Sequence, residues 1–274
     1  MKLSKIILIG LLFIGLSCHA QKFYIRGGLG VAVSTSASYT PDYNFVNNSY
    51  TVSLKKQGLG TGLPVVLAAG YKLNEHFGFE LGVDYFYGFP LKQHMDQAYT
   101  YYSTNDSKWR GQMLSIVPAF VLSLPLKKVN PYARLGLKLG VMNSVVYEDH
   151  QAFSTSVKAT AFTDIQSKSK EFGGIAIGAQ GAVGTDLVLS SLISLFVEIQ
   201  VDGISYSPTH GKNTEYIQDG VDVMSSRPVK QKEWEYKKEI AYPNTIPDDQ
   251  PNQLMKKNYY FGNVGMLVGV KIKL

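Results

Sequence analysis

Apolar and polar positions alternate along most of the chain after residue 20, and this two-residue period predicts β-strands. The clearest run is 77–90, where every odd position is apolar and the even positions are mainly glycine, with the carboxylates Glu80 and Asp84. Because successive side chains of a strand point to opposite faces, this strand has one apolar and one polar face. Runs of this kind predict eight strands, near 22–34, 62–73, 77–90, 109–124, 131–147, 172–187, 193–206 and 257–274.

Short and long connections alternate between the predicted strands. The short ones surround 74–76, 125–130 and 190–191. The long ones, all polar, cover 35–61, 91–108, 148–171 and 207–256. Short turns at one end and long segments at the other are typical of transmembrane β-barrels, in which the short turns are periplasmic. The longest segment, rich in charge, Pro and Asn, is expected to be either an ordered external cap or a mobile loop.

The alternation alone does not say which face points outward, because a soluble eight-stranded barrel would carry its apolar face inside. The polar face is rich in glycine, as a narrow interior requires, and its charges nearly balance. These features favour an all-β fold, an eight-stranded antiparallel transmembrane up-and-down β-barrel with long external loops. An outer aromatic girdle at the membrane interfaces is predicted to include Tyr71, Tyr85, Tyr87, Phe89, Tyr132 and Tyr147.

The charged residues of the polar face are predicted to form a polar network inside the barrel, because a small barrel is filled by its own side chains. Paired carboxylates such as Glu80 and Asp84 can also serve acid–base chemistry. Their place among interior cations favours the structural role over a catalytic one. The expected network consists of Arg26, Lys72, Glu80, Asp84, Arg134, Lys138, Asp186, Glu198, Asp202 and Lys271, with Lys273 at the strand end.

The same charges define the strand register. A slip of one residue in the fifth strand would turn Arg134 and Lys138 toward lipid, at a cost of about 2–4 kcal/mol each near the membrane midplane. By the same reasoning, Leu137→Lys is expected to prevent folding into membranes, whereas Gly136→Ser on the inner face is expected to be tolerated.

The first twenty residues have the pattern of a secretory signal peptide. Lys2 and Lys5 precede an apolar run over 6–16, and small residues lead to a predicted cut after Ala20. A lipoprotein signal with Cys18 as the lipidated residue is the alternative, but Gly15 stands where such signals usually have Leu. The expected organisation is therefore a signal peptide over 1–20 and one barrel domain over 21–274.

Composition excludes several classes of function for the exported part. Cys18 is the one cysteine of the sequence, so residues 21–274 can form no disulfide, thiolate nucleophile or zinc–thiolate site. The 27 Lys and Arg, two of them in the first twenty residues, face 21 Asp and Glu, which leaves residues 21–274 with a net charge of about +4. That excess is too small to indicate nucleic-acid binding.

The chain resembles the OmpA-like and PorT-like outer-membrane β-barrel proteins of Bacteroidetes. The resemblance rests on Ala20-Gln21, on the pattern Gly78-Phe79-Glu80-Leu81-Gly82, and on the last strand, Val268 to Leu274. It departs from the family pattern in Leu274, where an aromatic residue is usual, and in Leu267, where a polar residue is usual. The resemblance implies an outer-membrane location, contact with outer-membrane lipid, and biogenesis through periplasmic chaperones and a barrel assembly machinery.

Other motifs give no specific chemistry. The glycines of 58–62 lack the following helix of a phosphate-binding loop. His76, His94, His150 and His210 fall in different connections, and the tyrosine-rich pieces 42–45 and 99–102 suit either adhesion or loop packing. We therefore expect no catalytic, cofactor-binding or metal-binding residues. The predicted function is a structural or surface-binding role through the external loops, with an unknown extracellular ligand; the alternatives are a narrow-pore transport or secretion component and an enzyme.

Overall fold

The computed structural model describes residues 22–35, 38–46, 49–98, 102–154, 162–240 and 245–274. The predicted signal peptide, with Cys18, lies outside these residues, and so do the side chains of the two tyrosine-rich pieces. Within the described ranges, no helix has the length and apolar character needed to cross a membrane.

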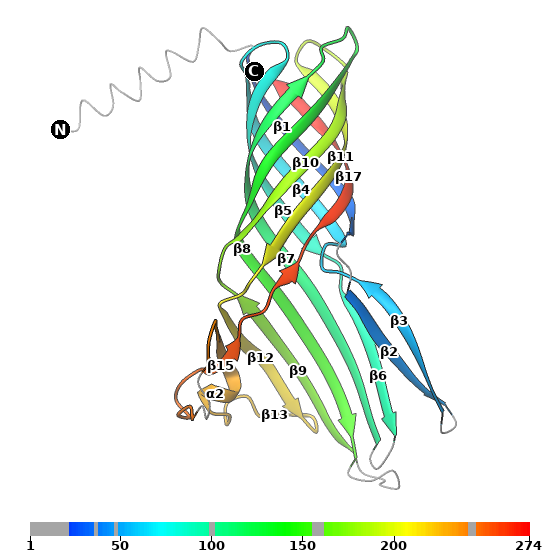
Figure 1. Cartoon of the computed structure of the whole chain (residues 1–274), viewed down its shortest axis with the longest axis vertical. Helices are drawn as coiled ribbons and strands as arrows, with labels where there is room; N and C mark the ends of the chain where they lie inside the picture. Colours follow the sequence, from blue (N-terminus) through cyan, green and yellow to red (C-terminus); the bar gives the residue numbers. More distant parts are fainter. Residues whose placement is uncertain (1–21, 36–37, 47–48, 99–101, 155–161, 241–244) are drawn as a thin grey trace, which may run out of the picture.

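Eight long antiparallel strands close into a barrel (Figure 1). They are β1 (Phe23–Ser34), β4 (Gly62–Lys72), β5 (Phe77–Gly88), β7 (Tyr102–Ser123), β8 (Val129–Phe153), β10 (Ala176–Val188), β11 (Ile193–Tyr206) and β17 (Asn263–Lys273). Each strand pairs with the next in this order, and β17 pairs with β1. Closure leaves no unpaired sheet edge, which is what a sheet in hydrocarbon requires. The predicted eight-stranded fold is confirmed.

The apolar face of the barrel points outward, as predicted. Leu29, Leu135 and Ile177 are each between 64% and 68% exposed on the outside, although they are large and apolar. Arg26 and Arg134, which lie on the same strands as Leu29 and Leu135, are buried inside. An outer surface of this kind is stable when lipid covers it, because burying each such side chain away from water contributes about 1.5–3 kcal/mol.

Two members of the predicted aromatic girdle lie elsewhere. Tyr132 is 7% exposed and points into the barrel, so its assignment to the outer girdle is wrong. Residue 132 has the same parity as Arg134, and alternation along β8 therefore turns both side chains inward. Tyr147 lies beyond the barrel, with its ring 5.0 Å from that of Trp109. Tyr85 and Phe89 are exposed on the outside.

The short turns are confirmed, whereas all four long connections differ from the predicted loops. The turns join β4 to β5, β7 to β8 and β10 to β11, each within four or five residues. The long connections contain further strands: β2 (Ser38–Val46), β3 (Ser49–Gln57), β6 (Leu91–Ala98), β9 (Thr163–Phe172), β12 (His210–Gln218), β13 (Val221–Asp222), β14 (Glu233–Lys237), β15 (Asn252–Met255) and β16 (Tyr259–Tyr260), with the short helix α2 (Val229–Lys232). Their sequences are mainly polar and show no two-residue apolar period, so the sequence does not mark them as strands.

A second region of sheet extends from the barrel at the end opposite the short turns and the C-terminus (Figure 1). There β7 and β8, 22 and 25 residues long, run beyond the barrel. On either side they pair with β6 and β9, and β9 pairs with β12. We call these five paired strands the extension sheet. In the described part of 207–256, β12 belongs to this sheet and is followed by β13, α2, β14 and β15, which favours the ordered alternative for that segment.

Candidate functional site

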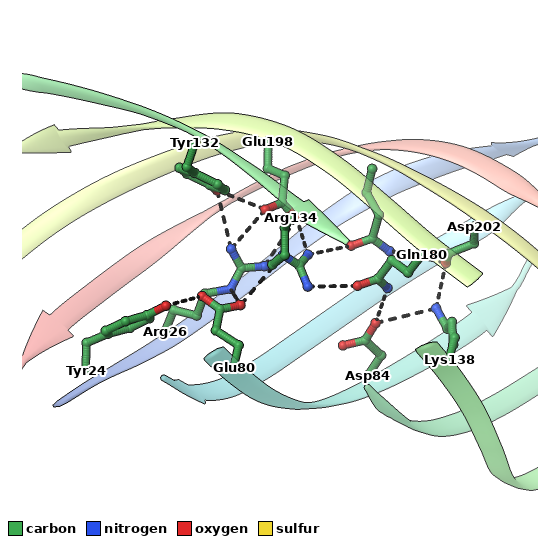
Figure 2. A network of polar contacts seen from close by, with 11 residues as sticks. Tyr24, Arg26, Glu80, Asp84, Tyr132, Arg134, Lys138, Gln180, Glu198 and Asp202 are labelled. Atoms are coloured by element: carbon green, nitrogen blue, oxygen red, sulfur yellow. Dashed lines mark hydrogen bonds and ion pairs between the residues drawn. The ribbon is translucent and has the colours of Figure 1, made fainter. Parts of the chain in front are cut away.

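The centre of the barrel is occupied by ion pairs around Glu198 (Figure 2). Arg26 donates to both carboxylate oxygens of Glu198, at 2.9 and 3.2 Å. Arg134 donates to the same carboxylate at 2.6 Å, and the Tyr132 hydroxyl donates to it at 2.9 Å. All four side chains are buried. Charge-assisted hydrogen bonds of this geometry are stronger than neutral ones, and these hold β1, β8 and β11 at a common level.

Glu80 is the second carboxylate of this cluster. Tyr24 donates to its Oε1 at 2.7 Å. Its Oε2 lies 3.6 Å from the Nε atoms of both Arg26 and Arg134. Two carboxylates thus balance two guanidinium groups inside the barrel, which is the condition for burying these charges without a large penalty.

A chain of hydrogen bonds continues from Arg134 toward the extension sheet (Figure 2). Arg134 donates to Gln180 at 2.8 Å, and Gln180 donates to Asp84 at 2.7 Å. Lys138 lies 2.6 Å from Asp202 and 3.5 Å from Asp84. The polar network therefore crosses the lumen from β5 to β8, β10 and β11.

The short-turn end of the lumen contains a separate pair. Lys271 Nζ lies 2.8 Å from Asp186 and 4.2 Å from the centre of the Tyr24 ring. Lys72 and Lys273 are only half-buried, and within the described residues neither has an ion-pair partner within 4.0 Å. Of the ten residues expected in the interior network, the structure brings nine into ion pairs and leaves Lys72 at the strand end.

Sequence reasoning missed three connecting residues and the apolar parts of the lumen. Tyr24, Tyr132 and Gln180 join the charged groups. The alternation places Tyr24 and Gln180 on the polar face but says nothing of this role, and Tyr132 was assigned to the outer face. Apolar residues also face inward, and parity cannot reveal that they gather in two clusters. The first comprises Val66, Val121, Tyr132, Phe196 and Leu267. Leu267, unusual in the family pattern, is fully buried there.

The second apolar cluster closes the lumen where the barrel meets the extension sheet. The Phe261 ring packs edge-to-face against Phe86 and Tyr206, with centroids 6.3 and 6.2 Å apart. Gly111 gives this ring its space, because a Cβ there would lie 2.3 Å from Phe261. The buried members are Ala32, Leu59, Phe86, Met113, Val145, Ala176, Ile204, Tyr206 and Phe261.

Gly70 is expected to be essential for the inner packing of Tyr24. A Cβ at Gly70 would lie 2.1 Å from Cζ of Tyr24, whose hydroxyl bonds Glu80. Gly70→Ala should therefore lower the free energy of unfolding by about 1–3 kcal/mol, as overpacking does. Urea unfolding in lipid vesicles measures the change. Gly203→Ala is the matched control, because the nearest atom to its added Cβ lies 4.0 Å away; equal destabilisation of both variants would contradict the packing argument.

The inner face of the extension sheet carries a polar cluster around Glu171. Lys257 lies 2.7 Å from Oε1 of Glu171, and the Tyr259 hydroxyl donates to Oε2 at 2.8 Å. Burial, together with the negative charge of Glu171, raises the pKa of Tyr259, so this hydroxyl stays protonated. The cluster ties the segment after β15 to β9.

The candidate histidines are not brought together. His94 lies 2.8 Å from Asp106, and His150 lies 2.7 Å from Asp164, on the extension sheet. His210 stacks on Phe172, and His76 belongs to a short turn. In the part of the chain that the structure describes, no group of three or more His, Cys, Asp or Glu residues is placed to hold a metal ion.

Comparison with known families gives one match. The profile of the OmpA-like transmembrane domain matches residues 19–180, which is more than half of the chain and runs from β1 into β10. Comparison with curated proteins finds none that matches. The matched region, the closed eight-stranded barrel and its apolar outer face agree with one another. The chain belongs to the family of OmpA-like transmembrane domains, and it is an outer-membrane β-barrel protein.

Proposed function

We propose that this outer-membrane barrel is non-enzymatic and has a structural or surface-binding role, which it performs through its external segments. The observation that carries the proposal is the filled lumen. Export by the signal peptide over 1–20, and assembly through periplasmic chaperones and the barrel assembly machinery, are parts of the same proposal. The likeness to PorT-like proteins stays a prediction.

The filling of the lumen argues against a pore. Polar residues from five strands pair across its middle, with contacts of 2.6–2.9 Å around Glu198. The apolar cluster around Phe261 covers the end toward the extension sheet. A barrel of eight strands is just wide enough to be filled by side chains. Opening a water path would separate buried ion pairs, which is costly.

The carboxylates of the lumen support the non-enzymatic part of the proposal. Glu80 and Asp84 are buried and lie within 3.6 Å of interior cations. A catalytic carboxylate needs access to a substrate, and these two are enclosed by their own partners. The polar surface that is accessible belongs to the extension sheet, which supports a binding role at that end.

Planar-bilayer recording of the purified protein tests the proposal. We expect no steady openings, because the interior ion pairs and the Phe261 cluster block the lumen. Gel mobility with and without boiling, measured on the same sample, shows that the barrel is folded. Steady openings of a folded sample would contradict the structural role and favour the narrow-pore transport or secretion alternative.

A further inference from the structure

A groove on the outer surface lies where the sheet changes partners. β8 pairs with β10 up to Gly140 and with β9 from Ser144 onward. Gly173 and Gly174, both with φ of +78°, form the turn that separates β9 from β10. Residues 141–143 and 173–175 therefore face each other without ladder pairing. A groove with a volume of about 530 Å³ opens at this gap.

The groove is fixed in place by interior hydrogen bonds. The Tyr206 hydroxyl donates to the carbonyl of Gly173 at 2.9 Å and lies 3.3 Å from that of Asn143. The Asn143 amide donates to the carbonyl of Gly140 at 2.8 Å. These side chains satisfy backbone groups that the interrupted ladder leaves without partners. The gap is thus a built feature of the fold.

One end of the groove is apolar and the other is cationic. Leu114, Val141 and Met142 line the end that continues the lipid-facing surface of the barrel, and Met142 is 70% exposed. Lys170 and Lys212 line the end on the extension sheet. The distance between the two ends can be measured along β8. Lys170 pairs with Val146, which lies four residues from Met142, and at about 3.3 Å per residue this separation is about 13 Å.

The two lysines face each other without a counter-ion. Lys170 and Lys212 are direct register partners on β9 and β12, and both are exposed. Within the described residues no carboxylate lies within 4.0 Å of either ammonium group; Glu233, the partner of Lys212 on β14, makes no such pair. Like charges placed directly opposite are destabilising. Such a pair is stabilised when an anion binds between its members.

A third cation lies in the same row of the sheet. Arg110 pairs with Val146, which pairs with Lys170, so the three side chains share one face. Arg110 donates to the Tyr87 hydroxyl at 2.7 Å, and its buried Nε has no acceptor. In the next row, Lys168 is already paired with Glu148 at 2.8 Å. The unpaired positive charge is thus concentrated next to the groove.

We propose that this groove binds a phosphate-bearing lipid of the external leaflet. The acyl chain would lie along Leu114, Val141 and Met142, and the phosphate between Lys170 and Lys212. The spacing of the two ends fits, because the headgroup layer is roughly 5–8 Å thick and the strands are tilted. Lysine side chains reach from their backbone toward the interface. Basic side chains at a membrane surface attract anionic lipid headgroups.

Retention of lipid A in phosphatidylcholine nanodiscs, measured by native mass spectrometry, tests the site with the full exported chain. The double variant Lys170→Gln/Lys212→Gln should bind bisphosphorylated lipid A roughly thirtyfold more weakly, at about fivefold per cation. The matched control is Lys238→Gln/Lys256→Gln, which removes the same charge at exposed positions away from the groove. Its affinity should stay within about twofold of the wild type.

Three results would overturn the proposal: equal losses in both double variants, equal retention of dephosphorylated lipid A, or inorganic phosphate binding as tightly as the lipid. Folding is checked by gel mobility in neutral detergent. There the groove variant should be at least as stable as the wild type, because the repulsion between the lysines is removed. The lipid site rests on the outer-membrane location and not on the closed lumen. A result in bilayer conductance that contradicts the structural role would therefore leave the lipid site untouched, and a failure of lipid retention would leave the structural role untouched.

Discussion

Glu198→Gln is expected to lower the free energy of unfolding by about 3–5 kcal/mol, the usual cost of removing one partner from a buried ion pair. Glu198 accepts hydrogen bonds from Arg26, Arg134 and Tyr132. A glutamine leaves the two guanidinium groups with the charge of Glu80 alone, at 3.6 Å. The change is measured by urea unfolding in lipid vesicles, with gel mobility as the readout of the folded fraction.

Glu148→Gln is the matched control for this experiment. Glu148 pairs with Lys168 at 2.8 Å on the extension sheet, where both side chains are more than 40% exposed. Solvent screens such a pair, so its loss should cost no more than about 1 kcal/mol. The double variant Glu198→Gln/Arg134→Gln should recover part of the lost stability, because it removes one unpaired buried cation. Equal effects of the two single variants would show that the lumen is hydrated.

Leu137→Lys is expected to reduce folding into membranes strongly, by about 2–4 kcal/mol near the midplane. Leu137 is 48% exposed on the outer surface, eight residues from the short-turn end of β8. A lysine there would place its charge in hydrocarbon. The measurement is the folded fraction after dilution from urea into lipid vesicles.

Leu126→Lys provides the control for charge itself. Leu126 lies in the short turn before β8 and is exposed, so a lysine there reaches water and should cost about 0–1 kcal/mol. Equal folding of Leu126→Lys and Leu137→Lys would mean that lipid does not cover the face that carries Leu137.

The structure revises the expectation that Gly136→Ser is harmless. A Cβ at Gly136 would lie 3.0 Å from Cγ1 of Val117 and 3.1 Å from Cβ of Ala119. Those neighbours must move by a few tenths of an ångström, so the serine tests packing as well as polarity. For this reason Leu126→Lys, in the short turn, is a better control for Leu137→Lys than Gly136→Ser is.

The sequence by itself determined the eight barrel strands, the three short turns and the direction of each face. These features are local: a period of two residues assigns Leu135 outward and Arg134 inward without reference to any other strand. The same rule turns Tyr132 inward. It was assigned to the outer girdle because it is aromatic, although its position in the strand indicated the inner face. Gln180 and Tyr24 were likewise readable as inward-facing residues, although their partners were not.

Tertiary structure alone decided which inward residues meet. Arg26 and Glu198 are 172 positions apart, and they touch because the stagger of the closed sheet brings β1 and β11 to one level. The same is true of the Phe261 cluster, the extension sheet and the groove beside Lys170 and Lys212. Alternation fixes the face of a residue but not its height along the barrel, and height depends on pairing between strands that are distant in the chain. Among the polar connections, β6 and β9 form strands because they pair with the parts of β7 and β8 that run beyond the barrel, and such pairing leaves no apolar period in their own sequences.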